Sequence, residues 1–271
     1  SRAALCGSLG SDSAAEVVRG GLRARSLEDL CAVALGGEVE TGEVLCLVTP
    51  DGERTFAYRP GASAALTAGA LKEALVAFGA TLDFAYFDVY TLLCPGRLPE
   101  EGMREARARG ARCGLNLGSS GMVAAERERL WALISSGACD AVTLNLPEAQ
   151  ALLAGGDGGP DALPAAEEAC ARLSAHCDLV VLTLGADGLW VARGRGAAPE
   201  KHGVQRVNPV EDSTGAGDFF AGGFLAAWLR GLPTETCVSW GYAAAAEVLA
   251  VLGADLPEDR WARLRGKCLS E

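Results

Sequence analysis

Short apolar runs alternate with longer amphipathic stretches through most of this sequence, and that alternation constrains its fold more than any other feature. The pattern is typical of βαβ units that build a parallel sheet. Strands are expected at residues 84–89, 113–117, 141–144 and 179–184. Helices are expected at residues 70–78, 100–109, 124–135, 147–154 and 163–175. Because right-handed crossovers place helices on both faces of one sheet, we predict a three-layer α/β/α domain with a mostly parallel sheet.

One part of the chain departs from the parallel pattern. Residues 43–49 and 54–58 flank a Pro-Asp-Gly-Glu turn at 50–53, which predicts an antiparallel β-hairpin at a sheet edge. The glycine-rich stretch 154–160 is typical of a surface loop rather than of a domain linker. With no internal repeat and no convincing boundary, residues 1–271 are predicted to form a single domain.

Composition excludes several classes of protein. The chain carries 24 basic and 35 acidic side chains, a net charge of −11, and without a basic stripe it is not expected to bind nucleic acid. Its longest strongly apolar stretch, residues 219–229, is too short to span a bilayer, so no membrane insertion is expected. The ten cysteines include no CxxC pair and lie mostly in apolar runs. They are interpreted as reduced side chains of an intracellular protein in a reducing compartment.

The most informative segment is Asp-Ser-Thr-Gly-Ala-Gly-Asp at 212–218, which is followed by an apolar pattern of helical period. Ser213 or Thr214 is expected to cap this helix, with residues 215–217 in its first turn. Since these residues lack bulky side chains, the backbone N–H groups and the helix dipole are open to an anion. The segment therefore predicts a phosphate or oxyanion site.

Asp218 lies in the same first turn, where a carboxylate has two interpretations. At a helix start it compensates the helix dipole. Beside an anion site it also suits the base of a phosphoryl transfer, because it can accept the proton of an attacking hydroxyl while the amides stabilise the transferred group. The residues alone leave both interpretations open.

Two further features end strands of the predicted sheet. Asn145 and Glu148 offer oxygen ligands for a hydrated Mg²⁺, or a helix cap followed by a helix-start carboxylate. Thr183, Gly185 and Gly188 form either a simple turn or a place where a ligand approaches the backbone. Both lie where open parallel sheets bind ligands, at the carboxyl ends of strands. The sequence has no GxxxxGK[ST], which excludes a Walker-type phosphate loop. It also lacks a GxGxxG fingerprint after a first strand, which counts against a dinucleotide-binding oxidoreductase.

Together these motifs resemble the PfkB or ribokinase-like family of sugar and nucleoside kinases. Residues 212–218 resemble the second signature of that family, residues 145–148 its NxxE motif, and residues 183–188 its nucleotide-contacting strand end. The hairpin region 41–62 resembles the adenosine-kinase-like branch, and residues 6–12 resemble an early G-x-x-G-x-D stretch. The resemblance covers nearly the whole chain and implies a ribokinase-like, Rossmann-like fold.

By this resemblance, the chain would transfer the γ-phosphate of ATP to a hydroxymethyl group of an adenosine-like nucleoside or a sugar, with Mg²⁺ as cofactor. Asp218 would be the catalytic base. The catalytic anion hole would be formed by Gly215, Ala216 and Gly217. The nucleotide would be bound by Thr183, Gly185, Gly188, Asp212 and Thr214. The metal would be organised by Asn145 and Glu148.

The resemblance is incomplete at the start of the chain. Family members begin with a strand and an acceptor-contacting Asp or Asn ahead of the stretch that residues 6–12 resemble. We therefore expect that the N-terminal strand and acceptor-binding segment are missing and that this chain is part of a longer polypeptide. The alternative is a non-catalytic PfkB-like subunit of a larger assembly. For the oligomeric state, a homodimer and a larger assembly are both left open. A third hypothesis is a regulatory module that binds nucleotide without transfer.

Overall fold

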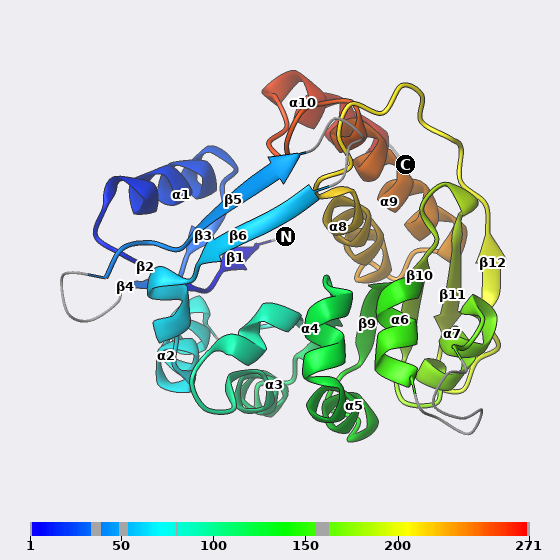
Figure 1. The fold of residues 1–271 in the computed structure, drawn as a ribbon, viewed down its shortest axis with the longest axis horizontal. Helices are drawn as coiled ribbons and strands as arrows, with labels where there is room; N and C mark the ends of the chain where they lie inside the picture. Colours follow the sequence, from blue (N-terminus) through cyan, green and yellow to red (C-terminus); the bar gives the residue numbers. More distant parts are fainter. Residues whose placement is uncertain (1, 34–38, 49–53, 80, 155–162, 270–271) are drawn as a thin grey trace. The chain divides into compact units, whose positions relative to one another are not determined.

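The computed structural model describes residues 2–33, 39–48, 54–79, 81–154 and 163–269 (Figure 1). The chain divides into two compact units, Ser1–Leu115 and Asn116–Glu271. That all 271 residues act as one domain stays a prediction.

The first unit is built from short sheets and amphipathic helices. Its parallel pairs are β1 (Ala4–Leu5) with β3 (Glu28–Asp29) and β2 (Ser8–Leu9) with β4 (Ala32–Val33). Two further strands, β7 and β8, are neighbours in one sheet and span Phe84–Asp88 and Arg112–Asn116. The helices are α1 (Ser13–Ala24), α2 (Ala68–Phe78), α3 (Leu98–Ala108) and the 3₁₀ turns η1 (Gly61–Ala65) and η2 (Val89–Leu93).

The predicted hairpin is present in this unit. Strands β5 (Glu43–Val48) and β6 (Arg54–Arg59) pair antiparallel, with Val44 opposite Tyr58, and form a two-stranded sheet of their own. The predicted turn at 50–53 lies outside the described residues, as does most of the predicted loop at 154–160.

Asp12 fixes the start of α1 in the first unit. Its carboxylate accepts hydrogen bonds from the N–H of Ala15 at 2.9 Å and from the hydroxyl and N–H of Thr41 at 2.7 and 2.6 Å. These donors, the Thr41 hydroxyl first, lower the pKa of Asp12 to about 2, since they stabilise its ionised form. One side chain thus caps a helix and ties down a segment far along the chain.

The second unit holds strands in the order β12-β11-β10-β9. β9 (Ala141–Asn145) and β10 (Leu179–Thr183) are parallel, whereas β11 (Leu189–Arg193) and β12 (Glu200–His202) continue antiparallel. The helices before β10 are α4 (Ser120–Ala125), α5 (Arg127–Ser135), α6 (Leu146–Leu153) and α7 (Ala166–Ser174). Those after it are η3 (Gly185–Asp187), α8 (Ala216–Trp228), α9 (Thr234–Leu249) and α10 (Glu258–Leu269).

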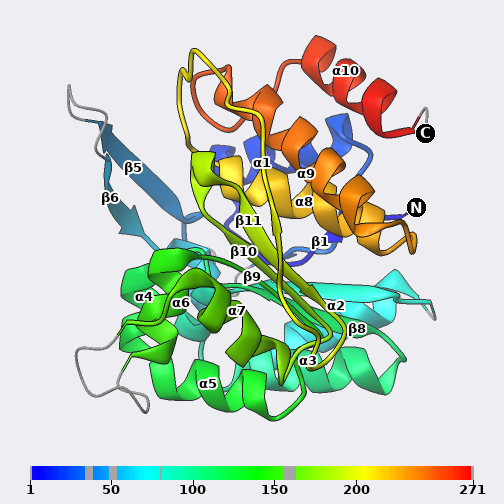
Figure 2. The same ribbon diagram turned by 90° about the vertical axis from the view of Figure 1, so that its right-hand side faces the viewer.

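Helices cover both faces of the strands of this unit. Figure 2 shows α8, α9 and α10 on one side of β9–β11 and α5, α6 and α7 on the other. The strands are buried on both faces, as continuous apolar runs such as 179–182 require. This layering follows the sequence-based prediction.

Two predicted helices differ from the observed ones. The helix expected at 124–135 is interrupted at Glu126, whose backbone (φ −110°, ψ 20°) separates α4 from α5. The helix expected from residue 163 begins only at Ala166, because Ala165 is extended. Among the described residues, none of the helices combines the length and apolar character needed to cross a bilayer.

Candidate active site

Helix α8 begins at a glycine-rich turn without a side-chain cap. The N-cap residue is Gly215, in the left-handed region at φ +77°, where a Cβ would lie 2.9 Å from the Cβ of Ala254. The prediction that Ser213 or Thr214 caps the helix is therefore wrong. Within the part of the chain that the structure describes, the N–H groups of Gly217 and Asp218 have no hydrogen-bond acceptor. The helix start thus presents open donors.

Thr214 does not cap the helix because its donors are used by Asp212. Oδ1 of Asp212 accepts from the Thr214 N–H at 2.9 Å and from its hydroxyl at 2.8 Å. Oδ2 accepts from the N–H of Gly253 at 2.9 Å. The neighbouring Glu211 N–H donates to the carbonyl of Leu249. Asp212 therefore braces the turn before α8 against the segment that follows α9.

Asp218, the predicted base, contacts a residue that motif reasoning missed. Its Oδ1 accepts a hydrogen bond of 3.0 Å from Nδ2 of Asn116, at the end of β8. Oδ1 of Asn116 accepts one of 3.2 Å from the hydroxyl of Thr143 in β9. Asp218 itself is exposed, whereas Thr143 is buried. One feature of the sequence could have identified Asn116 as a site residue: like Asn145, it ends an apolar strand.

Asn145 and Glu148 form a capping box at the start of α6. Asn145 donates its N–H and side-chain amide to the two Glu148 oxygens at 3.0 and 2.9 Å, and accepts from the Glu148 N–H at 2.9 Å. Glu148 is only 4% exposed. Burial raises the pKa of its carboxyl above the ordinary value, the Asn145 donors lower it, and the charge of Asp218 raises it further.

The capping box limits how these residues can serve Mg²⁺. Among the described residues, no group of three or more His, Cys, Asp or Glu side chains is placed to hold a metal ion. Each Glu148 oxygen keeps one lone pair beyond its capping bond. Mg²⁺ retains several of its waters, so Glu148 and Asn145 fit as partners of those waters rather than as a full ligand set. The repulsion between Glu148 and Asp218 is the kind that a divalent cation relieves.

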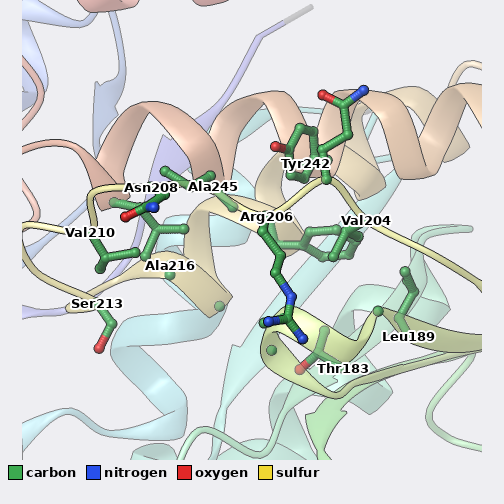
Figure 3. Close-up of a pocket in the computed structure, with 18 residues that line it drawn as sticks. Thr183, Leu189, Val204, Arg206, Asn208, Val210, Ser213, Ala216, Tyr242 and Ala245 are labelled. Carbon is green, nitrogen blue, oxygen red and sulfur yellow. The ribbon is translucent and has the colours of Figure 1, made fainter.

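A cavity of about 610 Å³ lies beside the start of α8. It is of the size that proteins use to bind a nucleotide or other small molecule. Figure 3 shows side chains from the β10 end, the segment after β12, α8 and α9 gathered around it. Its lining includes, from the predicted nucleotide and anion sites, Thr183, Gly185, Gly188, Ala216 and Gly217.

Local geometry explains parts of this lining. Gly188 has φ +94°, and a Cβ there would collide with the carbonyl oxygen of His202, so only glycine fits. Arg206, which points into the cavity in Figure 3, pairs with Asp187 at 3.6 Å. Most other lining side chains are apolar, such as Val204 and Leu189. The cavity thus offers mostly apolar walls with a few polar groups among them.

Comparison with known protein families decides what kind of chain this is. The family described as pfkB family carbohydrate kinase matches residues 1–261. This chain belongs to the pfkB family. Membership confirms the expected family, whose description is that of carbohydrate kinases.

The pfkB chain is similar to several nucleoside kinases. A crystal structure of adenosine kinase from Sinorhizobium meliloti matches with a TM-score of 0.84 and 29% identity, over 98% of this chain and 78% of that one. The cytidine kinase of Thermococcus kodakarensis is 44% identical over 77 residues, 28% of this chain and 27% of that protein. The adenosine kinase of Schizosaccharomyces pombe is 37% identical over 79 residues, 29% of this chain and 23% of that protein. The matches to the two curated relatives span about a quarter of their lengths.

The structural similarity confirms the predicted ribokinase-like α/β fold with a mostly parallel sheet, and the adenosine-kinase-like resemblance. It leaves the individual roles of the pfkB site residues as predictions. The structure brings Thr183 beside Asn145, because the two are paired in the parallel register of β10 and β9. Asp212, Thr214 and Asp218 do not line the cavity but lie along the turn and helix start that bound it.

Proposed function

We propose that this pfkB protein is an ATP-dependent kinase that transfers the γ-phosphate to a hydroxymethyl group of a nucleoside or a sugar. The observation that carries the proposal is the start of α8. There, N–H groups without an acceptor among the described residues lie next to the Asp218 carboxylate, at the wall of a cavity of nucleotide size. An adenosine-like acceptor ranks first, because two of the similar proteins are adenosine kinases and one is a cytidine kinase.

The proposed reaction uses the turn as an anion hole. The acceptor oxygen attacks the γ-phosphorus and forms a new O–P bond, while the bond from that phosphorus to the β–γ bridging oxygen breaks and its electrons leave with ADP. Asp218 takes the proton of the acceptor hydroxyl. The N–H groups of Gly215, Ala216 and Gly217 stabilise the charge on the transferred group, and the Ala216 N–H gives up the bond of 3.3 Å that it donates to the Ser213 carbonyl.

Other residues would hold the nucleotide. Thr183, Gly185 and Gly188 would lie along ATP in the cavity, while Asp212 and Thr214 would keep the turn in place at its phosphates. When bound, Mg²⁺ would neutralise phosphate charge. Asn145 and Glu148 would orient the waters of that ion from the start of α6.

An acceptor screen tests this proposal. Purified protein is given ATP, Mg²⁺ and one of adenosine, cytidine, ribose or fructose, and ADP release is followed with a coupled assay. We expect acceptor-dependent turnover, highest with a nucleoside. Asp218→Asn should lower kcat by roughly 10²–10⁴-fold, the usual contribution of a general base.

Glu235→Gln provides the matched control. Glu235 is an exposed carboxylate in the first turn of α9, so its loss removes one charge at a helix start away from the cavity. We expect turnover like that of the wild type. Absence of turnover with every acceptor, or full turnover in Asp218→Asn, would contradict the proposal and favour a non-catalytic subunit.

A further inference from the structure

We infer that Asn116 and Thr143 are positioning residues for Asp218, linked in the order Thr143 hydroxyl, Asn116 amide and Asp218 carboxylate. The two bonds measure 3.2 Å and 3.0 Å. Neither residue belongs to the motifs that identify the family segments of this chain. The inference rests on the proposed function, because it assigns the link a role in orienting the proposed base.

The backbone fixes the first bond. The N–H of Leu117 donates to the carbonyl of Thr143 at 3.1 Å, which holds the end of β8 against β9 one residue after Asn116. Thr143 is 4% exposed, so its hydroxyl acts from a buried and well-fixed position. The hydroxyl of Thr143 therefore reaches Oδ1 of Asn116 from a place that the sheet determines.

The amide of Asn116 carries this constraint to the helix. With Oδ1 occupied by a donor, the NH₂ group faces Asp218, and the opposite orientation would set the amide oxygen against a carboxylate. Asn116 is thus held at both ends of its amide.

The consequence for Asp218 is a preferred orientation of an otherwise exposed carboxylate. Among the described residues, Asn116 supplies the one hydrogen bond that Asp218 accepts, and it uses Oδ1. Oδ2 is left for the acceptor hydroxyl. A catalytic base must be placed within a few tenths of an ångström of its target. The restraint on Asp218 should therefore affect the reaction rate more than it affects the stability of the fold.

Kinetics of four variants test the role. Thr143→Val removes the hydroxyl at nearly constant volume and should lower kcat roughly three- to tenfold, the value of one ordinary hydrogen bond. Asn116→Leu should lower kcat roughly 10- to 100-fold, because a bond to a charged group is worth more. KM for ATP should stay within about twofold in both, since neither residue lines the cavity. Thr143→Ser should restore kcat, and Thr143→Val with Asn116→Leu should equal Asn116→Leu alone.

A spectroscopic measurement tests the link without requiring turnover. The chain contains three asparagines, at 116, 145 and 208, so ¹⁵N-asparagine labelling yields three side-chain amide signals. Asn116→Leu identifies its own signal by loss. That signal should shift in Thr143→Val and in Asp218→Ala, which keeps the number of asparagines at three, but not in Thr81→Val, whose threonine is exposed in the first unit.

The outcomes separate the two claims. A signal that moves in neither variant, or an active Thr143→Val with unchanged kcat, overturns the positioning role while the kinase proposal stands. An inactive wild type whose Asn116 signal responds to both variants overturns the proposed kinase function and leaves the link itself supported. Where Asn116→Leu does not fold, Asn145→Asp and Asn208→Asp assign the other two signals and leave that of Asn116 by elimination. Asp218 is exposed, so Asp218→Ala is expected to fold.

Discussion

Replacing Asp212 by Asn should weaken the turn that precedes α8. From described residues the carboxylate accepts three hydrogen bonds: two from Thr214 through Oδ1 and one from the Gly253 N–H through Oδ2. An asparagine has one oxygen, so either Thr214 or Gly253 would face an NH₂ group instead of an acceptor. The substitution therefore breaks the brace on one side whichever way the amide is oriented.

The magnitude follows from the bonds that are lost. A hydrogen bond to a charged group contributes about 1.5–3 kcal/mol, so Asp212→Asn should lower the free energy of unfolding by about 2 kcal/mol. For a domain of this size, the melting temperature should fall by roughly 4–8 °C. Thr214→Val removes one of these bonds, that of the hydroxyl, but keeps the N–H donor, and should cost about 1.5 kcal/mol, the lower end of that range.

Urea unfolding followed by far-UV circular dichroism gives these free energies. KM for ATP, measured on the same preparations, separates a structural role of Asp212 from direct contact with the nucleotide. A brace predicts that stability falls in both variants, more in Asp212→Asn. If Asp212→Asn unfolds within about 0.5 kcal/mol of the wild type while KM for ATP rises, the reasoning is refuted. Asp212 would then contact the nucleotide itself.

Two more predictions concern glycine and pH. Gly215→Ala should destabilise the protein by about 1–2 kcal/mol, because φ is +77° and the new Cβ would meet that of Ala254. A Cβ on Gly217 would meet nothing within 4 Å, so Gly217→Ala should leave the stability unchanged but raise KM for ATP. Thermal melts measure the stability of both variants, and initial rates measure their KM. Asp12, with its pKa lowered to about 2, contributes stability that is present above its usual pKa and is lost as the pH falls through about 4 to 2. Asp12→Asn should flatten that acid limb of the unfolding free energy, and an unchanged limb would assign it to other groups.

The strands were predictable because their signal is local. Residues 179–182 form an apolar run whose burial on both faces requires a central strand, and β10 lies there. The parallel arrangement then explains why Asn145 and Thr183 lie side by side: strands running in one direction end at one edge. Short-range pattern and topology together locate this part of the site.

The contacts that complete the site were not predictable from local pattern. Asn116 and Asp218 are 102 positions apart, and Asp212 and Gly253 are 41 apart, so only tertiary packing brings them together. The prediction of the N-cap of α8 failed for a related reason. Thr214 is a good capping residue in isolation, but Asp212, two positions earlier, accepts hydrogen bonds from its N–H and hydroxyl, and Gly215 is the N-cap residue instead.

The acidity of the chain constrains how it can bind a polyphosphate. Among the residues that line the cavity, Arg206 is the one basic side chain, and it is 75% exposed and paired with Asp187. An exposed ion pair of this kind contributes little. Under the proposed function, binding would then depend on the backbone donors at the start of α8 and on a divalent cation whose waters Glu148 would orient. Because backbone donors carry no net charge, the site can hold an anion without a basic patch, and a net charge of −11 is compatible with ATP as the substrate.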